Sequence, residues 1–303
     1  MMLTAVFFSY FWTASSFGQS AEPMSKSADA GRIVDANQLF IEATDAYRRK
    51  DFAGAAERYL RIIDAGTKWP TVPYNAACCF ARLARSDEAF KYLELAVQMG
   101  WSDAEHIKGD SDFESIHSDK RWDEIVRLCE GQQEKSRESI ANPELYAELM
   151  KRMKTDQDAR LAKPPNVIQM TLIDRDNTAW MKNVIEKHGW PGYAMVGREG
   201  AQAAWLLVQH ADRDPDFQRR CLELLKQAHK KEDASADHVA YLTDRVLVAE
   251  GKPQVYGTQF HAVNGKQQPF PIENEAEVDQ RRAAMGLEPI AVYAEQIRSQ
   301  YGP

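Results

Sequence analysis

The stretch YLTDRVLVAEGKPQVYGTQF, residues 241–260, places two side chains of opposite charge, Asp244 and Arg245, inside an apolar run. Both charges are therefore expected to be at least partly buried, and a buried charge has to be paired or hydrogen-bonded. Because successive residues on a helix point about 100° apart, the two side chains need separate partners from elsewhere in the chain. The candidate partners are Arg160 for the acid and Asp156 or Asp174 for the base.

A histidine and three further polar residues could complete a site with this pair. In a functional interpretation, His210 carries a proton, Asp244 orients its ring, and Arg245 binds an anionic group of a ligand. The other hydrogen-bonding contacts to the ligand are predicted to come from Gln209, Tyr256 and Gln259. The competing interpretation is a buried structural network that fixes one packing of four helices. The sequence leaves both interpretations open.

His210, Asp212 and Asp214 could be taken for metal ligands, but we expect no metal there. Asp214 precedes Pro215, which disfavours helical geometry at residue 214 and predicts that Asp214 is the N-cap of the next helix. A metal would then need His210 together with a carboxylate that the sequence does not identify. No cofactor is expected either.

Familiar catalytic motifs are absent from the sequence, including GxSxG, HExxH, the P-loop and GxGxxG after a strand. Two hypotheses about function follow. In the first, the chain is an exported interaction protein whose C-terminal domain binds a ligand without chemistry. In the second, that domain is a hydrolase or transferase. A solvent-open cleft containing His210 and Gln259 would favour the enzyme, and a sealed network would favour the binding protein.

Helices are predicted to position nearly all of these residues. Asn142 as N-cap and Pro143 at the first helical position begin one helix, and a Thr171–Asp174 pair resembles the capping box of another. The predicted helices span residues 143–161, a segment starting at Thr171, and residues 198–211, 215–228 and 236–250. The helix over 198–211 is apolar nearly all round, so it should be central.

A hairpin and two helices are predicted to complete the chain. Residues from Gln254 alternate as a strand does, with Gly257 in its middle, and Asn264-Gly265 is a typical two-residue hairpin turn. The return strand KQQPF is cut short by prolines, so it should be an edge. The last two helices are expected to run through about Met285 and from Pro289 to Tyr301.

Several blocks of this half occur together in order: DQDAR, DRDN, GWP, AAWLLVQHAD, AYLTDRVLV, GKPQVYGTQF, and PFPI before DQRRAAMGLEPIAVY. They resemble the signature blocks of a bacterial domain family of unknown function. The resemblance covers residues 143–302 and implies an architecture without implying an activity.

The first half contains an internal repeat of 34 residues. Ala43, Ala55, Tyr59 and Ile62 recur as Ala77, Ala89, Leu93 and Ala96, a period typical of helix-turn-helix solenoid units. The segments DAYRRKDFAGAAERYLRII and PYNAACCFARLARSDEAFKYLELAVQMGW resemble tetratricopeptide repeats. Lys50 and Ala84 stand where the usual glycine of the turn would be. The resemblance implies that a protein or peptide partner binds the repeats, although they could instead only brace the second domain.

A degenerate third unit, DSDFESIHSDKRWDEIVRL, is expected to close the repeats through Phe113, Ile116, Trp122 and Ile125. Residues 36–129 are then a repeat domain, residues 130–142 a polar connector or exposed helix end, and residues 143–302 a second domain that folds separately. The predicted fold is mainly α, a short tetratricopeptide-like helical solenoid followed by an α-helical domain with a small β-hairpin.

Charge and composition limit the partners. The chain has 303 residues and a formal net charge of −7, without any long cluster of Lys or Arg, so nucleic acid is not an expected partner. The cysteines, Cys78, Cys79, Cys129 and Cys221, lack metal-ligand spacing and are expected to be structural.

The first 18 residues, MMLTAVFFSYFWTASSFG, form a short apolar run that ends in small residues before a polar stretch. This pattern predicts a signal peptide, export to the periplasm or the extracellular space, and no integral membrane span after its removal. An uncleaved anchor is the alternative.

Overall fold

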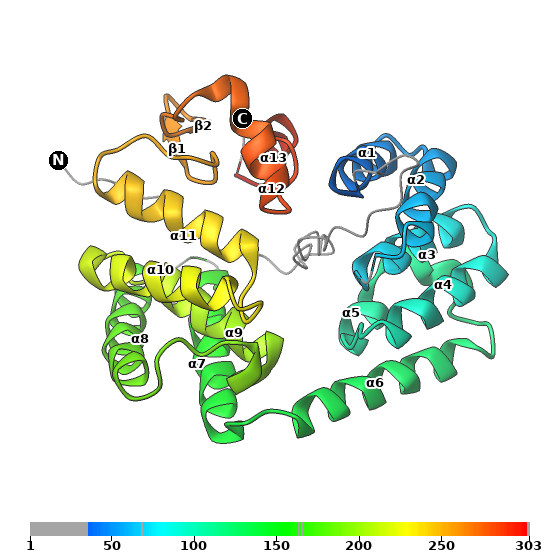
Figure 1. The fold of residues 1–303 in the computed structure, drawn as a ribbon, viewed down its shortest axis with the longest axis horizontal. Helices are drawn as coiled ribbons and strands as arrows, with labels where there is room; N and C mark the ends of the chain where they lie inside the picture. Colours follow the sequence, from blue (N-terminus) through cyan, green and yellow to red (C-terminus); the bar gives the residue numbers. More distant parts are fainter. Residues whose placement is uncertain (1–35, 68, 163, 165, 302–303) are drawn as a thin grey trace. The chain divides into compact units, whose positions relative to one another are not determined.

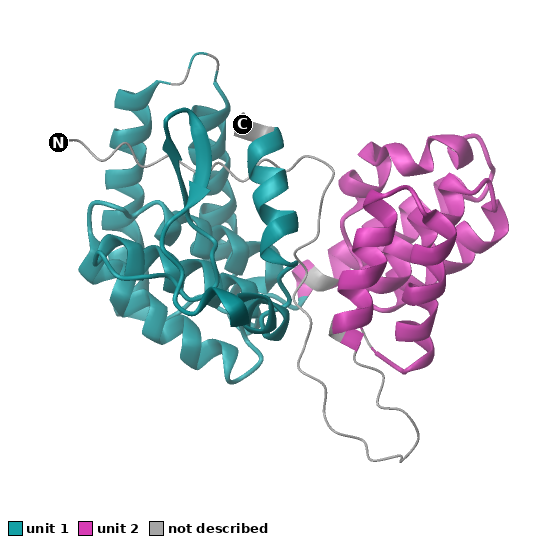
Figure 2. Cartoon of the chain, turned by 90° about the horizontal axis from the view of Figure 1, so that it is seen from above, with its two compact units in different colours: residues 1–11, 139–303 teal, residues 12–138 magenta. Residues whose placement is uncertain are grey.

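The computed structural model describes residues 36–301 except residues 68, 163 and 165, so the predicted signal peptide lies outside the described residues. The chain forms two compact units, which meet in sequence between Glu138 and Ser139 (Figure 2). Each unit has its own cluster of buried apolar side chains. The predicted fold class is confirmed: the protein is mainly α, with one small antiparallel hairpin (Figure 1).

The first unit along the chain contains the 34-residue sequence repeat, and we call it the repeat unit. Its helices pack in chain order. Helix α2 packs against both α1 and α3, and α3 packs against α4. The helices are α1 (Ala36–Arg48), α2 (Phe52–Asp64), α3 (Thr71–Arg82), α4 (Ser86–Gln98), α5 (Ala104–Gly109), η1 (Ser111–Ile116) and α6 (Trp122–Glu138). The small repeated residues, Ala43, Ala55, Ala77 and Ala89, have no exposed surface, so neighbouring helices approach closely at these positions.

The closing segment packs as its pattern predicts, because Phe113, Ile116, Trp122 and Ile125 are all buried. Helix α6 continues to Glu138, so most of the polar segment 130–142 is the exposed end of a helix. All four cysteines are buried and free of disulfides.

The second unit is built around α9 (Tyr193–Gln209), which contacts four other helices. These are α7 (Pro143–Leu161), α8 (Val167–His188), α10 (Pro215–His229) and α11 (Ala236–Ala249). Trp205, Leu206, Leu207 and Val208 are buried, as the all-round apolar pattern predicts. The unit ends with β1 (Phe260–Val263), β2 (Lys266–Pro269), η2 (Glu275–Glu277), α12 (Val278–Ala284) and α13 (Ile290–Tyr301).

The capping-box prediction at Thr171 is wrong. Helix α8 begins four residues earlier, because the side chain of Asn166 accepts a hydrogen bond from the Gln169 N–H at 3.0 Å and forms the N-cap. The caps predicted at Asn142 and Asp214 are both confirmed, each by a side chain that accepts from the backbone three residues on.

The strand predicted from Gln254 is also wrong, since β1 begins only at Phe260. Gln254 forms an isolated bridge with Ile272, and Gly257 has a positive φ of 71°. The hairpin that follows is as predicted. Asn264 and Gly265 both have positive φ values, of 51° and 78°, as a type I′ turn requires, and Val263 pairs with Lys266.

The described helices include none with the length and apolar content needed to cross a membrane.

Two turns of the repeat unit carry backbone strain. Lys50 and Ala84 have φ values of 63° and 56°, in the left-handed region that favours glycine. We expect Lys50→Gly to raise the free energy of unfolding of this unit by roughly 0.5–1 kcal/mol, because glycine adopts this conformation without the Cβ clash. Lys91→Gly, on the exposed side of α4, is the matched control and should lower stability by about 1 kcal/mol. Chemical denaturation measures both, and a destabilising Lys50→Gly would contradict the prediction.

Candidate functional site

A small pocket with a volume of about 10 Å³, room for about one water molecule, lies in the second unit between α9, α11, α13 and the segment that precedes β1. Its wall combines aromatic rings with a few polar groups, the composition typical of small-molecule sites. The lining residues are Trp205, Leu206, Gln209, His210, Tyr241, Arg245, Thr258, Gln259 and Tyr293.

Four residues predicted from the sequence line this pocket together: Gln209, His210, Arg245 and Gln259. Two helices and a loop therefore bring them to one pocket from positions up to 50 residues apart. The other two predicted site residues, Asp244 and Tyr256, are not part of the lining.

Asp244 holds a loop instead of orienting His210. Its carboxylate has no exposed surface and accepts hydrogen bonds from the backbone N–H groups of Val255, Tyr256 and Thr258 at 2.7–3.2 Å. The Thr258 hydroxyl donates to it at 3.0 Å. The predicted partner, Arg160, is therefore wrong. Burial raises the pKa of the Asp244 carboxyl, and the four donors oppose that shift.

These bonds explain why the predicted strand does not form. A strand would pair the N–H groups of residues 255–258 along a ladder, but the Asp244 carboxylate takes three of them. We call residues 254–259 the clamped loop.

Two arginines that were not among the predicted site residues donate to backbone carbonyls of the clamped loop. Arg281 donates from Nε to the Val255 carbonyl at 2.8 Å, and Arg282 donates from Nη1 to the Tyr256 carbonyl at 2.6 Å. Arg282 is fully buried and its guanidinium lies 5.0 Å from the centre of the Tyr293 ring. In the sequence these residues form an Arg-Arg pair in α12. Such a pair is typical of a charged helix surface, so it does not indicate contacts with a loop.

Arg245 pairs with residues at the C-terminal end of α9, so its predicted partners, Asp156 and Asp174, are also wrong. Its Nε donates to Gln209 Oε1 at 2.7 Å, and its Nη1 donates to both carboxylate oxygens of Asp212 at 2.9 and 3.1 Å. The Arg245 side chain is 12% exposed, so this pair is largely shielded from water.

Gln218 fixes the same end of α9. It is fully buried, and its Nε2 lies within 3.1–3.3 Å of the carbonyls of Val208 and Gln209 and of the Asp212 carboxylate. The last carbonyls of a helix have no partner inside it, and Gln218 satisfies two of them. Gln218 stands in an ordinary amphipathic helix, so its sequence context gives no signal of this role.

His210 is oriented by Asp156, not by Asp244. Its Nδ1 lies 3.0 Å from Asp156 Oδ1, and both side chains are buried. Arg160 donates to Asp156 at 3.0–3.2 Å and also pairs with Asp174. Helices α7, α8 and α9 thus meet at a buried network of two carboxylates, one arginine and one histidine.

The pKa values of the two carboxyls in this network are shifted in opposite directions. Burial acts to raise the pKa of Asp156, but the hydrogen bond and charge of His210, together with Arg160, outweigh it and hold that pKa at about 2. Burial raises the pKa of Asp174 to about 6, with Arg160 acting in the opposite direction. Asp156 is therefore a permanent anion that favours a proton on His210 Nδ1 and leaves Nε2 as an acceptor in the neutral ring.

Asp156, Asp174 and His210 lie close enough to hold a metal ion. However, the guanidinium of Arg160 already bonds both carboxylates and supplies the positive charge that a cation would bring. The charge of the two carboxylates is already balanced by this guanidinium, so the residues do not fit a metal.

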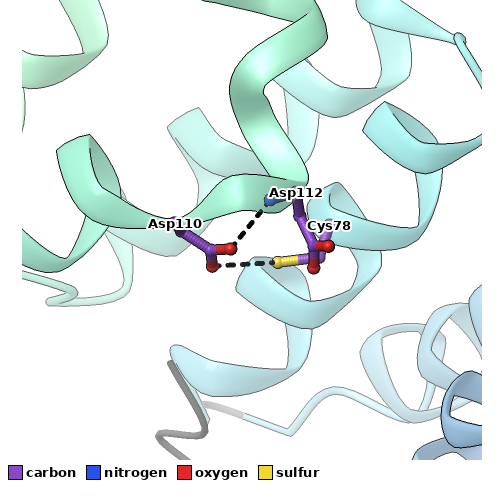
Figure 3. A group of neighbouring side chains, drawn as sticks. All are labelled: Cys78, Asp110 and Asp112. Atoms are coloured by element: carbon purple, nitrogen blue, oxygen red, sulfur yellow. Dashed lines mark hydrogen bonds between the residues drawn. The ribbon is translucent and has the colours of Figure 1, made fainter. Parts of the chain in front are cut away.

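The repeat unit contains a second such group, formed by Cys78, Asp110 and Asp112 (Figure 3). Cys78 Sγ lies 3.8 Å from Asp110 Oδ2, while the hydroxyls of Tyr74 and Tyr47 donate to Asp110 and Asp112. Burial and both aspartates raise the pKa of the Cys78 thiol well above its ordinary value. Because tyrosine hydroxyls already donate to both carboxylates, the contacts indicate a structural role.

The Asp244 clamp yields a stability prediction. An amide at residue 244 accepts through one oxygen and turns its NH₂ toward backbone donors, so Asp244→Asn should lower the free energy of unfolding by roughly 3 kcal/mol or more. Asp216→Asn, at an exposed carboxylate on α10, is the control and should change stability by less than about 0.5 kcal/mol. Denaturant titration measures the free energy of unfolding of both variants. If Asp244→Asn lowered it as little as Asp216→Asn does, the Asp244 carboxylate would not be holding the loop.

The raised pKa of Asp174 yields a pH prediction. Because its folded-state pKa of about 6 exceeds the ordinary value of 3.8, the folded chain binds this proton more tightly than the unfolded chain. The stability of the wild type relative to Asp174→Asn should therefore fall as the pH rises, by roughly 1 kcal/mol between about pH 5 and about pH 7. Asp176→Asn, at an exposed acid of the same helix, should show a constant difference. If the stability of the wild type relative to Asp174→Asn rose with pH, the pKa of Asp174 would not be raised in the folded chain.

Comparisons with known proteins give a short match to one relative and a match to a family. No solved structure matches the chain. A chloroplastic protein of Arabidopsis thaliana is 32% identical over 54 residues, which are 18% of this chain and 16% of that protein. The chain thus matches less than a fifth of that relative, too little to transfer an activity.

A family model matches residues 143–303, which make up more than half of the chain and contain the pocket, the clamped loop and the His210 network. This agrees with the unknown-function family expected from the ordered sequence blocks, and its span begins at the first residue of α7. The chain belongs to this family, the family of unknown function DUF6624.

Proposed function

We propose that the second unit is a small-molecule binding domain and that its ligand occupies the pocket between α9, α11, α13 and the clamped loop. The observation that carries the proposal is Gln209 Nε2. This atom is buried and has no hydrogen-bond partner among the described residues, although Gln209 lines the pocket. A buried donor without an acceptor costs about 1–3 kcal/mol, so an acceptor supplied by a ligand would be favoured there.

The walls support this proposal. The Tyr241 and Tyr293 rings meet edge to face with their centres 6.1 Å apart, and Trp205 stacks on His238 with 4.2 Å between ring centres. Such packing makes an apolar surface beside the polar groups, and a ligand larger than a water molecule would bind by moving these rings apart.

The alternative is that the same unit is a hydrolase or transferase. The observation that favours it is the His210–Asp156 pair at the pocket wall, in which a buried carboxylate orients a histidine as a general base requires. Under this alternative the wild type converts its ligand, and His210→Gln binds the ligand without converting it. Mass spectrometry of incubated ligand distinguishes the two functions.

The repeat unit is proposed to bind a protein or peptide. Its helices stack in order as in tetratricopeptide-like solenoids, and such surfaces commonly receive peptides. Cross-linking of the native protein followed by mass spectrometry tests this, and cross-links confined to the chain itself would count against it.

Export is proposed from the apolar run at residues 1–18. N-terminal sequencing of the native protein should begin at Gln19, whereas a cytoplasmic product beginning at Met1 or Met2 would contradict export.

A thermal-shift screen of small molecules tests ligand binding in the pocket. Ligands that raise the melting temperature of the wild type should lose their effect in His210→Gln and Gln259→Leu, because both side chains line the pocket. Both variants should melt within a few degrees of the wild type, which corresponds to about 1 kcal/mol for a domain of this size. Gln268→Leu, at an exposed residue of β2, is the control and should retain every ligand.

Two results would refute the proposal. One is a screen in which no ligand depends on these residues. The other is a loss of stability in both variants as large as that of Asp244→Asn, which would make His210 and Gln259 ordinary core groups.

A further inference from the structure

Three buried side chains of the pocket, those of Gln209, His210 and Gln259, surround a space of the size of one water molecule, whether or not a larger ligand ever binds. These residues are 5%, 4% and 7% exposed, and the pocket has a volume of about 10 Å³. A buried water needs about two to four polar partners. The polar atoms that these three side chains leave free therefore decide what occupies the space.

The orientation of the Gln209 amide is fixed by a neighbour that can only donate. Arg245 donates from Nε to Gln209 Oε1 at 2.7 Å, and a guanidinium has no acceptor atom. The NH₂ group of Gln209 therefore has to find its acceptor elsewhere. Gln209 Nε2 is buried and has no partner among the described residues, so it is a free donor at the pocket.

The orientation of the Gln259 amide is fixed through Thr258. The single hydroxyl proton of Thr258 is donated to Asp244 Oδ2 at 3.0 Å, so this hydroxyl can only accept from its other neighbour. Gln259 accordingly donates from Nε2 to Thr258 Oγ1 at 3.0 Å. Gln259 Oε1 is left as an acceptor, without a donor in the part of the chain that the structure describes.

The third polar group is the ring of His210. Its Nδ1 lies 3.0 Å from Asp156 Oδ1, which leaves Nε2 as the ring atom that is available at the pocket. In the neutral ring with its proton on Nδ1, Nε2 accepts a hydrogen bond, whereas in the protonated ring it donates one. An occupant that can both donate and accept satisfies either form.

These groups favour an uncharged occupant. A cation would meet the N–H groups of Gln209, and an anion would meet the lone pairs of Gln259 Oε1. The charge of Arg245 is already compensated by Asp212, so it does not draw a second anion into the pocket. Water both donates and accepts, so it fits the donor and the acceptors together.

We infer that the pocket binds one ordered water molecule. This water accepts from Gln209 Nε2 and donates to Gln259 Oε1 and to His210 Nε2, and it thereby joins the C-terminal end of α9 to the clamped loop. It supplies the acceptor that the buried Gln209 donor lacks. A larger ligand would have to displace this water and reproduce its hydrogen bonds.

A high-resolution crystal structure of the full chain tests the inference. It should show one water within about 2.7–3.2 Å of Gln209 Nε2, Gln259 Oε1 and His210 Nε2. Gln259→Leu removes one of the acceptors, so the water should be lost from this variant at the same resolution. Gln268→Leu, at an exposed residue of β2, is the matched control and should retain the water.

Magnetic relaxation dispersion of ¹⁷O-labelled water is a second measurement, and it needs no crystal. It counts the long-lived internal waters of a protein in solution. The count should fall by one in Gln259→Leu and in Gln209→Met, and it should stay at the wild-type value in Gln268→Leu. Circular dichroism checks that the variants fold, and if one of the two pocket variants does not, the other decides.

Three results would overturn the inference. One is a wild-type pocket that holds no water, another is a water that contacts none of the three side chains, and the third is a water count that the folded pocket variants leave unchanged. An anomalous scattering signal from an ion in the pocket would overturn it as well. None of these results decides the proposed function, which the thermal-shift screen tests separately.

Discussion

The carboxylate of Asp244 is the interaction on which the second unit depends. One buried side chain satisfies three backbone N–H groups and one hydroxyl of a loop that has no regular structure of its own. Arg281 and Arg282 take the carbonyls of the same loop. A buried loop outside a β-sheet would leave backbone N–H and C=O groups without hydrogen bonds. These side chains supply the hydrogen bonds that a neighbouring strand would otherwise provide.

The effect of this clamp reaches the pocket through Thr258. Because Asp244 uses the hydroxyl proton of Thr258, that hydroxyl decides which end of the Gln259 amide faces it. Arg245 decides the orientation of the Gln209 amide in the same manner. Asp244 and Arg245, adjacent in sequence, thus determine the hydrogen-bonding character of two lining residues. The divergence of about 100° between neighbouring helical side chains makes this possible.

Much of this arrangement could be predicted from the sequence, because helix periodicity and capping are local signals. The caps at Asn142 and Asp214, the central helix α9 and the hairpin turn all depend on residues within a few positions of one another. The partners of Asp244 and Arg245 could not be predicted, since charge pairing depends on tertiary distances. The clamped loop was mistaken for a strand because its alternation is genuine while its N–H groups are bound elsewhere. Gln218 gave no local signal, and the Arg281-Arg282 pair gave one that is typical of surface charge.

The adjacency of Asp244 and Arg245 also has a mechanical consequence. Both side chains belong to one turn of α11, so a small rotation of that helix about its axis would move the loop and the end of α9 in concert. The loop and the end of α9 are therefore linked through one helix. A one-residue insertion before this turn would rotate both contacts away together.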